Sequence, residues 1–214
     1  MTHLDVGTRR SIDAVVFDFG GVITTSPFEH MARIGTGADP DAVLELLIGP
    51  YHDDTDHPWH RAERGEIDIF TWITEVTAAG AEAGVTFDFG AMRGALGVVH
   101  DEVVDRIARL RVEGYRTALL TNNVREAAAS WRAMVDCDAL FDVVVDSSAE
   151  GVRKPDPRIY RLTLDRLGVD DPARAVFLDD HEGNVAGAAR AGLRTILVAD
   201  PAAAIAELDA LLAG

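Results

Sequence analysis

Residues 14–24 read AVVFDFGGVIT. The first four of them are continuously apolar, as is typical of a strand in a parallel sheet that is covered on both faces. Asp18 follows this run directly. In open parallel sheets the carboxyl ends of the strands gather at one edge, where ligands bind. The stretch therefore predicts a buried strand that presents a carboxylate at a binding edge.

Four more short apolar runs are typical of buried strands, and helical patterns separate the later ones. Residues 101–113 place apolar side chains on one stripe and end at Gly114. Asp156 and Pro157 open a second helix that ends at Gly168. Alternating strands and helices predict an α/β fold with a doubly wound parallel sheet and a Rossmann-like core. The four strands are predicted at residues 117–120, 143–145, 175–178 and 195–198, and a third helix at 183–191.

One interval interrupts this alternation. About ninety residues separate the first two predicted strands, far more than a normal crossover connection needs. Their pattern is mostly helical, as at residues 42–48 and 68–79. We predict a core of residues 1–25 and 97–214, with residues 26–96 inserted over the sheet as a helical cap. The alternative is a long crossover whose surface helices have no lid role.

Polar side chains also follow the second, third and fourth predicted strands, at the point where each strand ends. Because these ends meet at one edge, the side chains are expected to lie close together. A polar residue after a single strand says little, whereas carboxylates and a hydroxyl–amide triplet at the same edge predict a binding site. They are Thr121, Asn122 and Asn123 after the second strand, Asp146, Ser147 and Ser148 after the third, and Asp179 and Asp180 after the fourth.

Four stretches, in this order, resemble the haloacid dehalogenase-like superfamily, in its phosphatase-type branch with a helical cap after the first strand. The resemblance covers residues 12–200. Within the predicted cap, WHRAERGEI at residues 59–67 is similar to a stretch in relatives of the epoxide hydrolase phosphatase domain. The four stretches are AVVFDFGGVIT (14–24), ALLTNN (118–123), GVRKPDPRIY (151–160) and VFLDDHEGN (176–184).

The resemblance implies a hydrolase of small phosphorylated metabolites that works through an aspartyl-phosphate on Asp18. Lys154 is implied to bind the phosphate and to hold the nucleophile, and Thr121 and Asn122 to contact the substrate. A carboxylate nucleophile repels a phosphate unless cations neutralise both, which is the physical reason for a lysine at this site. Without the other motifs, a lysine solvated on a loop explains Lys154 equally well.

The resemblance also implies a Mg²⁺ cofactor, since Mg²⁺ is held by a few carboxylates and several waters. The implied ligands are Asp18, the backbone carbonyl of Gly20, and Asp180, with Asp179 adjoining. Considered alone, Asp179 and Asp180 fit a helix N-cap pair, which is common for acidic residues before a helix.

Gly20 departs from the family pattern. The family's phosphatases carry a second Asp at this position, which acts as general acid to the leaving group and then as base for water, a role worth about 100- to 10,000-fold. The carbonyl of Gly20 can still bind the metal. The alternatives are a phosphatase that uses another acid, a dehalogenase, which also lacks that Asp but has no acidic pair after the fourth strand, and a catalytically weak binding protein. His181 is a candidate for the missing acid, although it also fits a polar residue in the first turn of a helix.

Residues 51–60, YHDDTDHPWH, have the composition of a metal-binding cluster, because His57 and His60 stand three apart among carboxylates. Pro58 is expected to break any helix that would align the two histidines. We therefore predict a polar cap loop that faces the pocket, with a second metal site as the alternative. Trp59 and Trp72 are predicted to pack in the core of the cap.

The chain is strongly acidic, with 36 Asp and Glu against 20 Lys and Arg and a formal charge of −16. Such a surface repels nucleic acids and anionic membranes, so the expected partner is a small-molecule phosphate ester, with no nucleic acid and no membrane. No secretion signal and no apolar run of ~20 residues is found, which favours a cytoplasmic location. The expected state is a monomer or a homodimer, and the sequence does not decide between them. Cys137 is the single cysteine and is expected to be a small buried residue.

Overall fold

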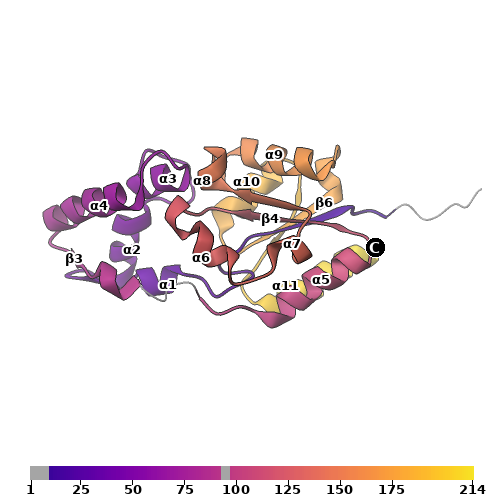
Figure 1. Cartoon of the computed structure of the whole chain (residues 1–214), viewed down its shortest axis with the longest axis horizontal. Helices are drawn as coiled ribbons and strands as arrows, with labels where there is room; N and C mark the ends of the chain where they lie inside the picture. Colours follow the sequence, from indigo (N-terminus) through magenta and orange to yellow (C-terminus); the bar gives the residue numbers. More distant parts are fainter. Residues whose placement is uncertain (1–9, 93–96) are drawn as a thin grey trace, which may run out of the picture.

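A five-stranded parallel sheet forms the centre of the computed structural model, which describes residues 10–92 and 97–214 (Figure 1). The strands lie in the order β5-β4-β1-β6-β7, and every pairing is parallel. The predicted doubly wound α/β fold and its five strands are confirmed. The strands are β1 (Ala14–Phe17), β4 (Arg116–Thr121), β5 (Val143–Asp146), β6 (Ala175–Asp179) and β7 (Arg194–Leu197).

Both faces of the sheet are covered by helices. Alternate residues of a strand point to opposite faces. Val15 and Phe17 accordingly pack in one hydrophobic cluster with α5 and α11, and Ala14 and Val16 in another with α9 and α10. Figure 1 shows these two pairs of helices on opposite sides of the sheet, which explains why the strand sequences are continuously apolar. The helices are α5 (Asp101–Val112), α9 (Pro157–Leu167), α10 (Glu182–Arg190) and α11 (Pro201–Ala213).

The other elements around the sheet are short. Cys137, at the start of α7, is buried in the same cluster as Phe17, in agreement with its expected role. None of the described helices is long and apolar enough to span a bilayer. The short elements are η2 (Arg125–Ala127), α6 (Ala128–Arg132), α7 (Cys137–Leu140), α8 (Ser147–Glu150) and η3 (Pro172–Arg174).

Between β1 and α5 the chain forms a helical insert at one end of the molecule (Figure 1). Val43, Leu47 and Trp72 are fully buried in a third hydrophobic cluster, which belongs mainly to the insert. The predicted helices at 42–48 and 68–79 correspond to α2 and α4. The elements are α1 (Phe28–Met31), β2 (Gly35–Thr36), α2 (Pro40–Ile48), α3 (Pro58–Glu63), α4 (Ile69–Ala83), β3 (Thr86–Phe87) and η1 (Phe89–Met92).

Pro58 is the first residue of α3, so part of the predicted loop is helical, but no described helix contains both His57 and His60, as was expected from Pro58. His57 is the N-cap, and its Nδ1 accepts a hydrogen bond from the Trp59 N–H at 3.2 Å. Proline suits the first position of a helix because the N–H that it lacks would find no intrahelical partner there. Trp59 and Trp72 pack with ring centroids 5.1 Å apart in the cluster of the insert, as predicted.

Candidate active site

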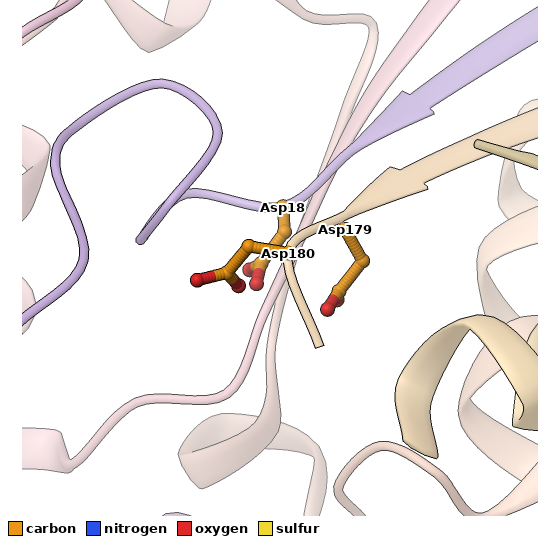
Figure 2. A group of neighbouring side chains, drawn as sticks. All are labelled: Asp18, Asp179 and Asp180. Carbon is orange, nitrogen blue, oxygen red and sulfur yellow. The ribbon is translucent and has the colours of Figure 1, made fainter. Parts of the chain in front are cut away.

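Three carboxylates meet at the carboxyl edge of the two central strands (Figure 2). Phe17 lies opposite Leu178 in the register of β1 and β6, so the residues that follow, Asp18 and Asp179, emerge side by side. One oxygen of each of Asp18, Asp179 and Asp180 lies within 4.8 Å of the others. Asp18 and Asp179 are buried, and Asp180 is half-buried. The predicted convergence of these side chains is therefore present in the fold.

Lys154 lies between two of the carboxylates. Its Nζ is 2.8 Å from Asp18 Oδ1 and 2.7 Å from Asp179 Oδ2, and the side chain has no exposed surface. The alternative of a solvated loop lysine is therefore wrong. Burial would lower the pKa of Lys154, but the charges of Asp179 and Asp18 outweigh it and raise the pKa above its ordinary value. The lysine is consequently a permanent cation at neutral pH.

The loop that carries Lys154 is attached to the end of β4 by Asn122. The Asn122 Oδ1 accepts from the Lys154 backbone N–H at 2.8 Å, and the Asn122 Nδ2 donates to the Lys154 carbonyl at 3.0 Å. This reciprocal pair holds the backbone of Lys154 in place. Thr121, directly before, is buried, and its Oγ1 makes only a long contact of 3.5 Å to the Asn122 carbonyl. Its hydroxyl is therefore available to a ligand.

The acidic side chain at the end of β5 has a structural function instead. Asp146 Oδ1 accepts from the backbone N–H and the hydroxyl of Ser148 and so caps α8. Ser147 Oγ accepts from the Asn123 N–H at 3.0 Å, which joins the loops after β4 and β5. Of the polar residues predicted at the edge, Asp146, Ser147 and Ser148 therefore stabilise the neighbouring loops and α8.

The carboxylates carry more negative charge than Lys154 can balance. Burial, together with the charges of Asp179 and Asp180, raises the pKa of Asp18 well above its ordinary value, against the lowering effect of Lys154. Burial, and then the charge of Asp179, raise the pKa of Asp180 to about 6. Three carboxylates face one ammonium group, and they offer hard oxygen ligands within 4.8 Å of one another. The donor set fits a small divalent cation such as Mg²⁺.

Asp179 and Asp180 have different surroundings. Asp179 Oδ1 accepts from the His181 N–H and Asn184 Nδ2, and Oδ2 accepts from Lys154 Nζ and Asn184 Nδ2. His181 is the N-cap of α10, where its Nδ1 accepts from the Gly183 N–H at 3.2 Å. The interpretation of the acidic pair as the N-cap is therefore wrong. Asp179 is occupied in holding Lys154, which leaves Asp180 as the more accessible ligand.

A cavity of about 340 Å³ opens in front of Asp18, between the core and the insert. The core contributes Asp18, Gly20 and Thr121, and the insert contributes Tyr51 and Trp59. Asp180, His181 and Asn122 also line it. A volume of this size is typical of small-molecule sites.

A family model for haloacid dehalogenase-like hydrolases matches residues 12–192. The chain is a haloacid dehalogenase-like hydrolase. The match covers more than three quarters of the sequence, and the resemblance carried by the four motifs is confirmed.

Several relatives of this haloacid dehalogenase-like hydrolase are longer proteins. Mouse acyl-CoA dehydrogenase family member 10 is 34% identical over 95% of the chain, which spans 19% of that protein. Rat bifunctional epoxide hydrolase 2 is 34% identical over 93% of the chain, which spans 38% of that protein. Phosphatase MT3486 of Mycobacterium tuberculosis is 40% identical, with 88% of each chain covered.

Solved structures share the fold. A predicted HAD-like family hydrolase from Porphyromonas gingivalis superposes with a TM-score of 0.67 at 25% identity, over 92% of this chain and 98% of that one. A dehalogenase with an intermediate complex gives a TM-score of 0.67 at 22% identity, over 96% and 99% of the two chains. At this identity the dehalogenase shows the fold alone.

The two glycines in the turn after Asp18 of this haloacid dehalogenase-like hydrolase differ in the substitutions that they permit. Gly21 has a φ of +75°, and a Cβ there would lie 1.9 Å from Asp180 Oδ2. Only glycine allows the Asp180 carboxylate to approach so closely. Gly20 has no such φ, and a Cβ there would meet Pro27 Cδ at 3.2 Å. A side chain at position 20 is thus restricted by one neighbour and not by the backbone.

A buried ion pair that the sequence did not reveal joins the insert to the core. Arg153 Nε donates to Glu63 Oε2 at 2.7 Å, and the Tyr51 hydroxyl donates to Glu63 Oε1 at 2.9 Å. The guanidinium carbon of Arg153 lies 4.8 Å from the centroid of the Tyr51 ring. Arg153 and Glu63 are at most 1% exposed. Both lie in stretches that resemble the family, but nothing in one sequence indicates that residues so far apart are partners.

This buried pair leads to a stability prediction. Glu63→Gln removes the nearer of the two carboxylates that compensate Arg153, the other being Asp54 at 3.7 Å. It is expected to lower the free energy of unfolding by about 3 kcal/mol, since breaking one half of a buried pair leaves a poorly compensated charge. Urea denaturation measures the loss. The double variant Glu63→Gln with Arg153→Met should recover part of it, because the unpaired cation is gone. The matched control is Glu150→Gln, whose partner Arg166 is 41% exposed; it should cost less than about 1 kcal/mol. The prediction is contradicted if Glu63→Gln lowers the free energy of unfolding by no more than the control Glu150→Gln does.

The histidines of residues 51–60 do not form a metal site. Among the described residues only Asp18, Asp179 and Asp180 group as ligands in this way. His60 is fully buried, and its Nδ1 accepts from the Thr55 N–H at 3.0 Å. Burial, with the charge of Arg153 second, lowers the pKa of His60 to about 3. The loop faces the cavity through Tyr51 and Trp59, whereas His57 and His60 do not line it.

Proposed function

We propose that this haloacid dehalogenase-like hydrolase is a magnesium-dependent phosphatase that hydrolyses monoesters of small molecules through an aspartyl-phosphate on Asp18. One observation carries the proposal. Asp18 Oδ1 accepts from the Phe19 N–H at 2.7 Å and lies 2.8 Å from Lys154 Nζ. Both contacts are to the same oxygen, which leaves Oδ2 for attack on a ligand in the cavity.

In this mechanism Asp18 Oδ2 attacks the phosphorus atom, the bond to the alcohol oxygen breaks, and the leaving oxygen takes a proton from solvent water, which releases the alcohol. Water then hydrolyses the aspartyl-phosphate, which releases inorganic phosphate and restores Asp18. Phosphoryl transfer requires positioning and neutralisation of charge more than covalent chemistry. Lys154 supplies a fixed positive charge beside the nucleophile, and the Thr121 hydroxyl supplies a donor to the phosphate oxygens. Asn122 contributes through its backbone and by holding Lys154.

The acidic group would hold the metal. Asp18, Asp180 and the carbonyl of Gly20 are the proposed ligands, and Asp179 orients Lys154 beside them. When bound, Mg²⁺ would neutralise charge on the phosphate and on the carboxylates.

The insert is proposed to act as the cap, with boundaries at residues 26–96. Its residues Tyr51, Trp59 and Glu63 line the same cavity as Asp18. A wall formed by both parts can exclude water during the transfer.

Relatives favour this function over the alternatives. Phosphatase MT3486 aligns over most of its length, and the phosphoglycolate phosphatase of Cupriavidus necator is 33% identical over 87% of the chain. A (S)-2-haloacid dehalogenase of Burkholderia cepacia is 27% identical over only 46% of the chain. Gly20 is the observation that favours a dehalogenase or a binding protein, whereas the pair Asp179 and Asp180 favours the phosphatase.

The deciding experiment offers p-nitrophenyl phosphate and 2-chloropropionate to the protein, each with Mg²⁺ and with EDTA. Release of p-nitrophenol that requires Mg²⁺ supports the phosphatase. Metal-independent chloride release indicates a dehalogenase, and no turnover of either indicates a binding protein.

Metal binding gives a prediction with a readout besides activity. Addition of roughly 10 mM MgCl₂ should raise the melting temperature of the wild type by about 3–6 °C for a dissociation constant near 1 mM. Asp180→Asn should lose this shift. Its metal-free melting temperature should equal or exceed that of the wild type, because one of three crowded carboxylates is neutralised. Asp146→Asn, a buried carboxylate outside the cavity, serves as the control and should keep the shift. An unchanged shift in Asp180→Asn would remove Asp180 from the metal site.

A further inference from the structure

The wall of the cavity in front of Asp18 is mostly apolar. From the insert it includes Phe28, Met31, Trp59 and Ile69, and from the core it includes Phe19 and Trp131. Phe28 packs edge-on against Tyr51 with ring centroids 5.0 Å apart, which fixes one side of the wall. Apart from the group around Asp18, this surface offers few partners for the hydroxyls of a sugar, and polar groups buried without partners are costly.

The charges that line the cavity are all of one sign. Asp18, Glu63, Glu126 and Asp180 are the charged residues on its described wall, and no Lys or Arg lines it. Lys154 lies behind Asp18 and Asp179, where it contacts both. Arg153 donates to the Glu63 carboxylate and to the Asp53 backbone carbonyl, and it forms an ion pair with Asp54 at 3.7 Å. Lys154 and the proposed metal can therefore neutralise the charge of a phosphate at Asp18. No cation on the described wall would neutralise a second anionic group on the substrate.

We infer that the substrate is a phosphate monoester whose alcohol or phenol is uncharged and predominantly apolar, of aromatic or branched hydrocarbon character. This inference rests on the proposed phosphatase function and names its substrate class. Apolar contact with the wall supplies the binding energy, since each buried methylene contributes roughly fourfold in affinity. The acidic wall supplies the selectivity, because like charges placed together are strongly unfavourable. Carboxylated and doubly phosphorylated metabolites are thereby excluded.

The test uses phosphate esters whose phenols differ in apolar surface and charge but have nearly the same acidity as leaving groups. Phenyl, 4-ethylphenyl, 4-propylphenyl and 4-butylphenyl phosphate add methylenes at nearly constant phenol acidity. The phosphate ester of 3-(4-hydroxyphenyl)propanoate matches the 4-propylphenyl ester in length but ends in a carboxylate. With Mg²⁺ present, kcat/KM should rise by about tenfold from the 4-ethyl to the 4-butyl ester. The carboxylate ester should be at least about tenfold worse than the 4-propyl ester.

A pair of variants tests whether the wall itself makes the selection. Phe28→Arg places a cation on the cavity wall and should lower the preference for the 4-propyl ester over the carboxylate ester by at least about tenfold. Phe70→Arg makes the same substitution at a residue of α4 that is 71% exposed and does not line the cavity. It should leave the preference unchanged, because an exposed charge is screened by solvent and salt.

The outcomes separate the inference from the function on which it rests. If p-nitrophenyl phosphate is hydrolysed but the carboxylate ester equals or exceeds the 4-propyl ester, the inferred substrate class is wrong and the phosphatase remains. If no ester is hydrolysed with Mg²⁺, both the function and the inference fail. The comparison within the wild type stands even where Phe28→Arg does not fold. Phe28→Arg and Phe70→Arg could also lose the preference for the 4-propyl ester over the carboxylate ester to the same extent. The total charge of the protein, and not the cavity wall, would then determine which ester is preferred, and the inference would be wrong.

Discussion

Replacement of Asp18 by Asn is expected to lower kcat for every phosphate ester by about 10,000-fold or more, because it removes the attacking electron pair. The melting temperature should stay close to that of the wild type. Turnover of p-nitrophenyl phosphate and thermal unfolding, measured on the same preparation, test both parts of this expectation.

The surroundings of Asp18 explain why the fold should tolerate the change. The Phe19 N–H and Lys154 Nζ both contact Oδ1, and an Asn oxygen can accept both of these bonds. The Asn amide nitrogen then takes the position of Oδ2, the oxygen that makes neither of these contacts. Lys154 keeps its partner, since Asp179 Oδ2 lies 2.7 Å away. Burial, with the charges of Asp179 and Asp180, raises the pKa of Asp18, so neutralising it also relieves repulsion.

Asp146→Asn is the matched control for this variant. Asp146 is a buried carboxylate at the same edge of the sheet, but it caps α8 and does not line the cavity. The substitution keeps the oxygen that Ser148 contacts and should leave kcat within a few fold of the wild type. Wild-type turnover by folded Asp18→Asn would exclude Asp18 as the nucleophile. A similar loss in both variants would mean that the effect arises from damage to the edge of the sheet.

The sheet and the polar side chains at its carboxyl edge could be predicted because both depend on local patterns. Continuous apolar runs such as residues 14–17 identify strands that are covered on both faces. The residue after each run must then lie at the carboxyl edge, which brought Asp18, Asp179 and Thr121 together without knowledge of any contact. The ends of the strands differ from the prediction by at most one or two residues, which does not change the order of these side chains.

The ion pair between Arg153 and Glu63 could not be predicted in the same way. The two residues lie 90 positions apart and belong to different parts of the chain. A single sequence shows the charges but not their partners, and a buried arginine is uncommon enough that an exposed loop residue was the ordinary expectation. The apolar wall escaped prediction for a related reason, since it combines side chains of the insert and the core whose facing sides depend on how the two pack.

Pro58 shows that a correct local rule does not by itself place the boundary of an element. Proline does disrupt the interior of a helix, but the first position of a helix accepts it. The sequence did not indicate where α3 begins, and His57, which caps the helix, is not among the residues most favoured at that position. α3 can begin at Pro58 because the residue lies at the boundary of the helix, where the low helix propensity of proline does not apply.

Gly20→Asp is expected to raise kcat/KM for esters with poor leaving groups by about 100- to 10,000-fold, and for aryl esters far less. In the proposed mechanism, Gly20 occupies the position at which the resemblance implies a general acid, and glycine has no side chain to serve as one. Esters of phenols need little protonation as they leave, whereas alkyl esters need the proton in the transition state. The comparison of 4-nitrophenyl phosphate with an alkyl phosphate such as hexyl phosphate, in wild type and variant, measures the difference.

The backbone permits this substitution. Gly20 does not have the left-handed conformation that reserves a position for glycine, unlike Gly21. The added Cβ would lie 3.2 Å from Pro27 Cδ, so the proline ring must shift by a few tenths of an ångström. Gly20 and Pro27 both line the cavity, which places the new side chain along its wall. Gly20→Ala is the matched control, because it adds the same Cβ without the carboxyl group, and a thermal melt of both variants separates steric strain from lost chemistry.

A selective gain for hexyl phosphate in Gly20→Asp, with none in Gly20→Ala, would show that the site is already arranged for phosphoryl transfer and lacks only the proton donor. A folded Gly20→Asp that gains nothing on hexyl phosphate would contradict this. So would a wild type that already hydrolyses hexyl phosphate as fast as the aryl ester, because another group would then supply the proton. His181 would be the first residue to replace in that case: it lines the cavity, and its Nδ1 is engaged by the Gly183 N–H, which leaves Nε2 for the leaving group. Burial lowers the pKa of His181, however, so at neutral pH it is mostly uncharged and a weak acid. A carboxyl group at position 20, on the wall of the same cavity as Asp18 and held by the turn after β1, is the better donor on these grounds.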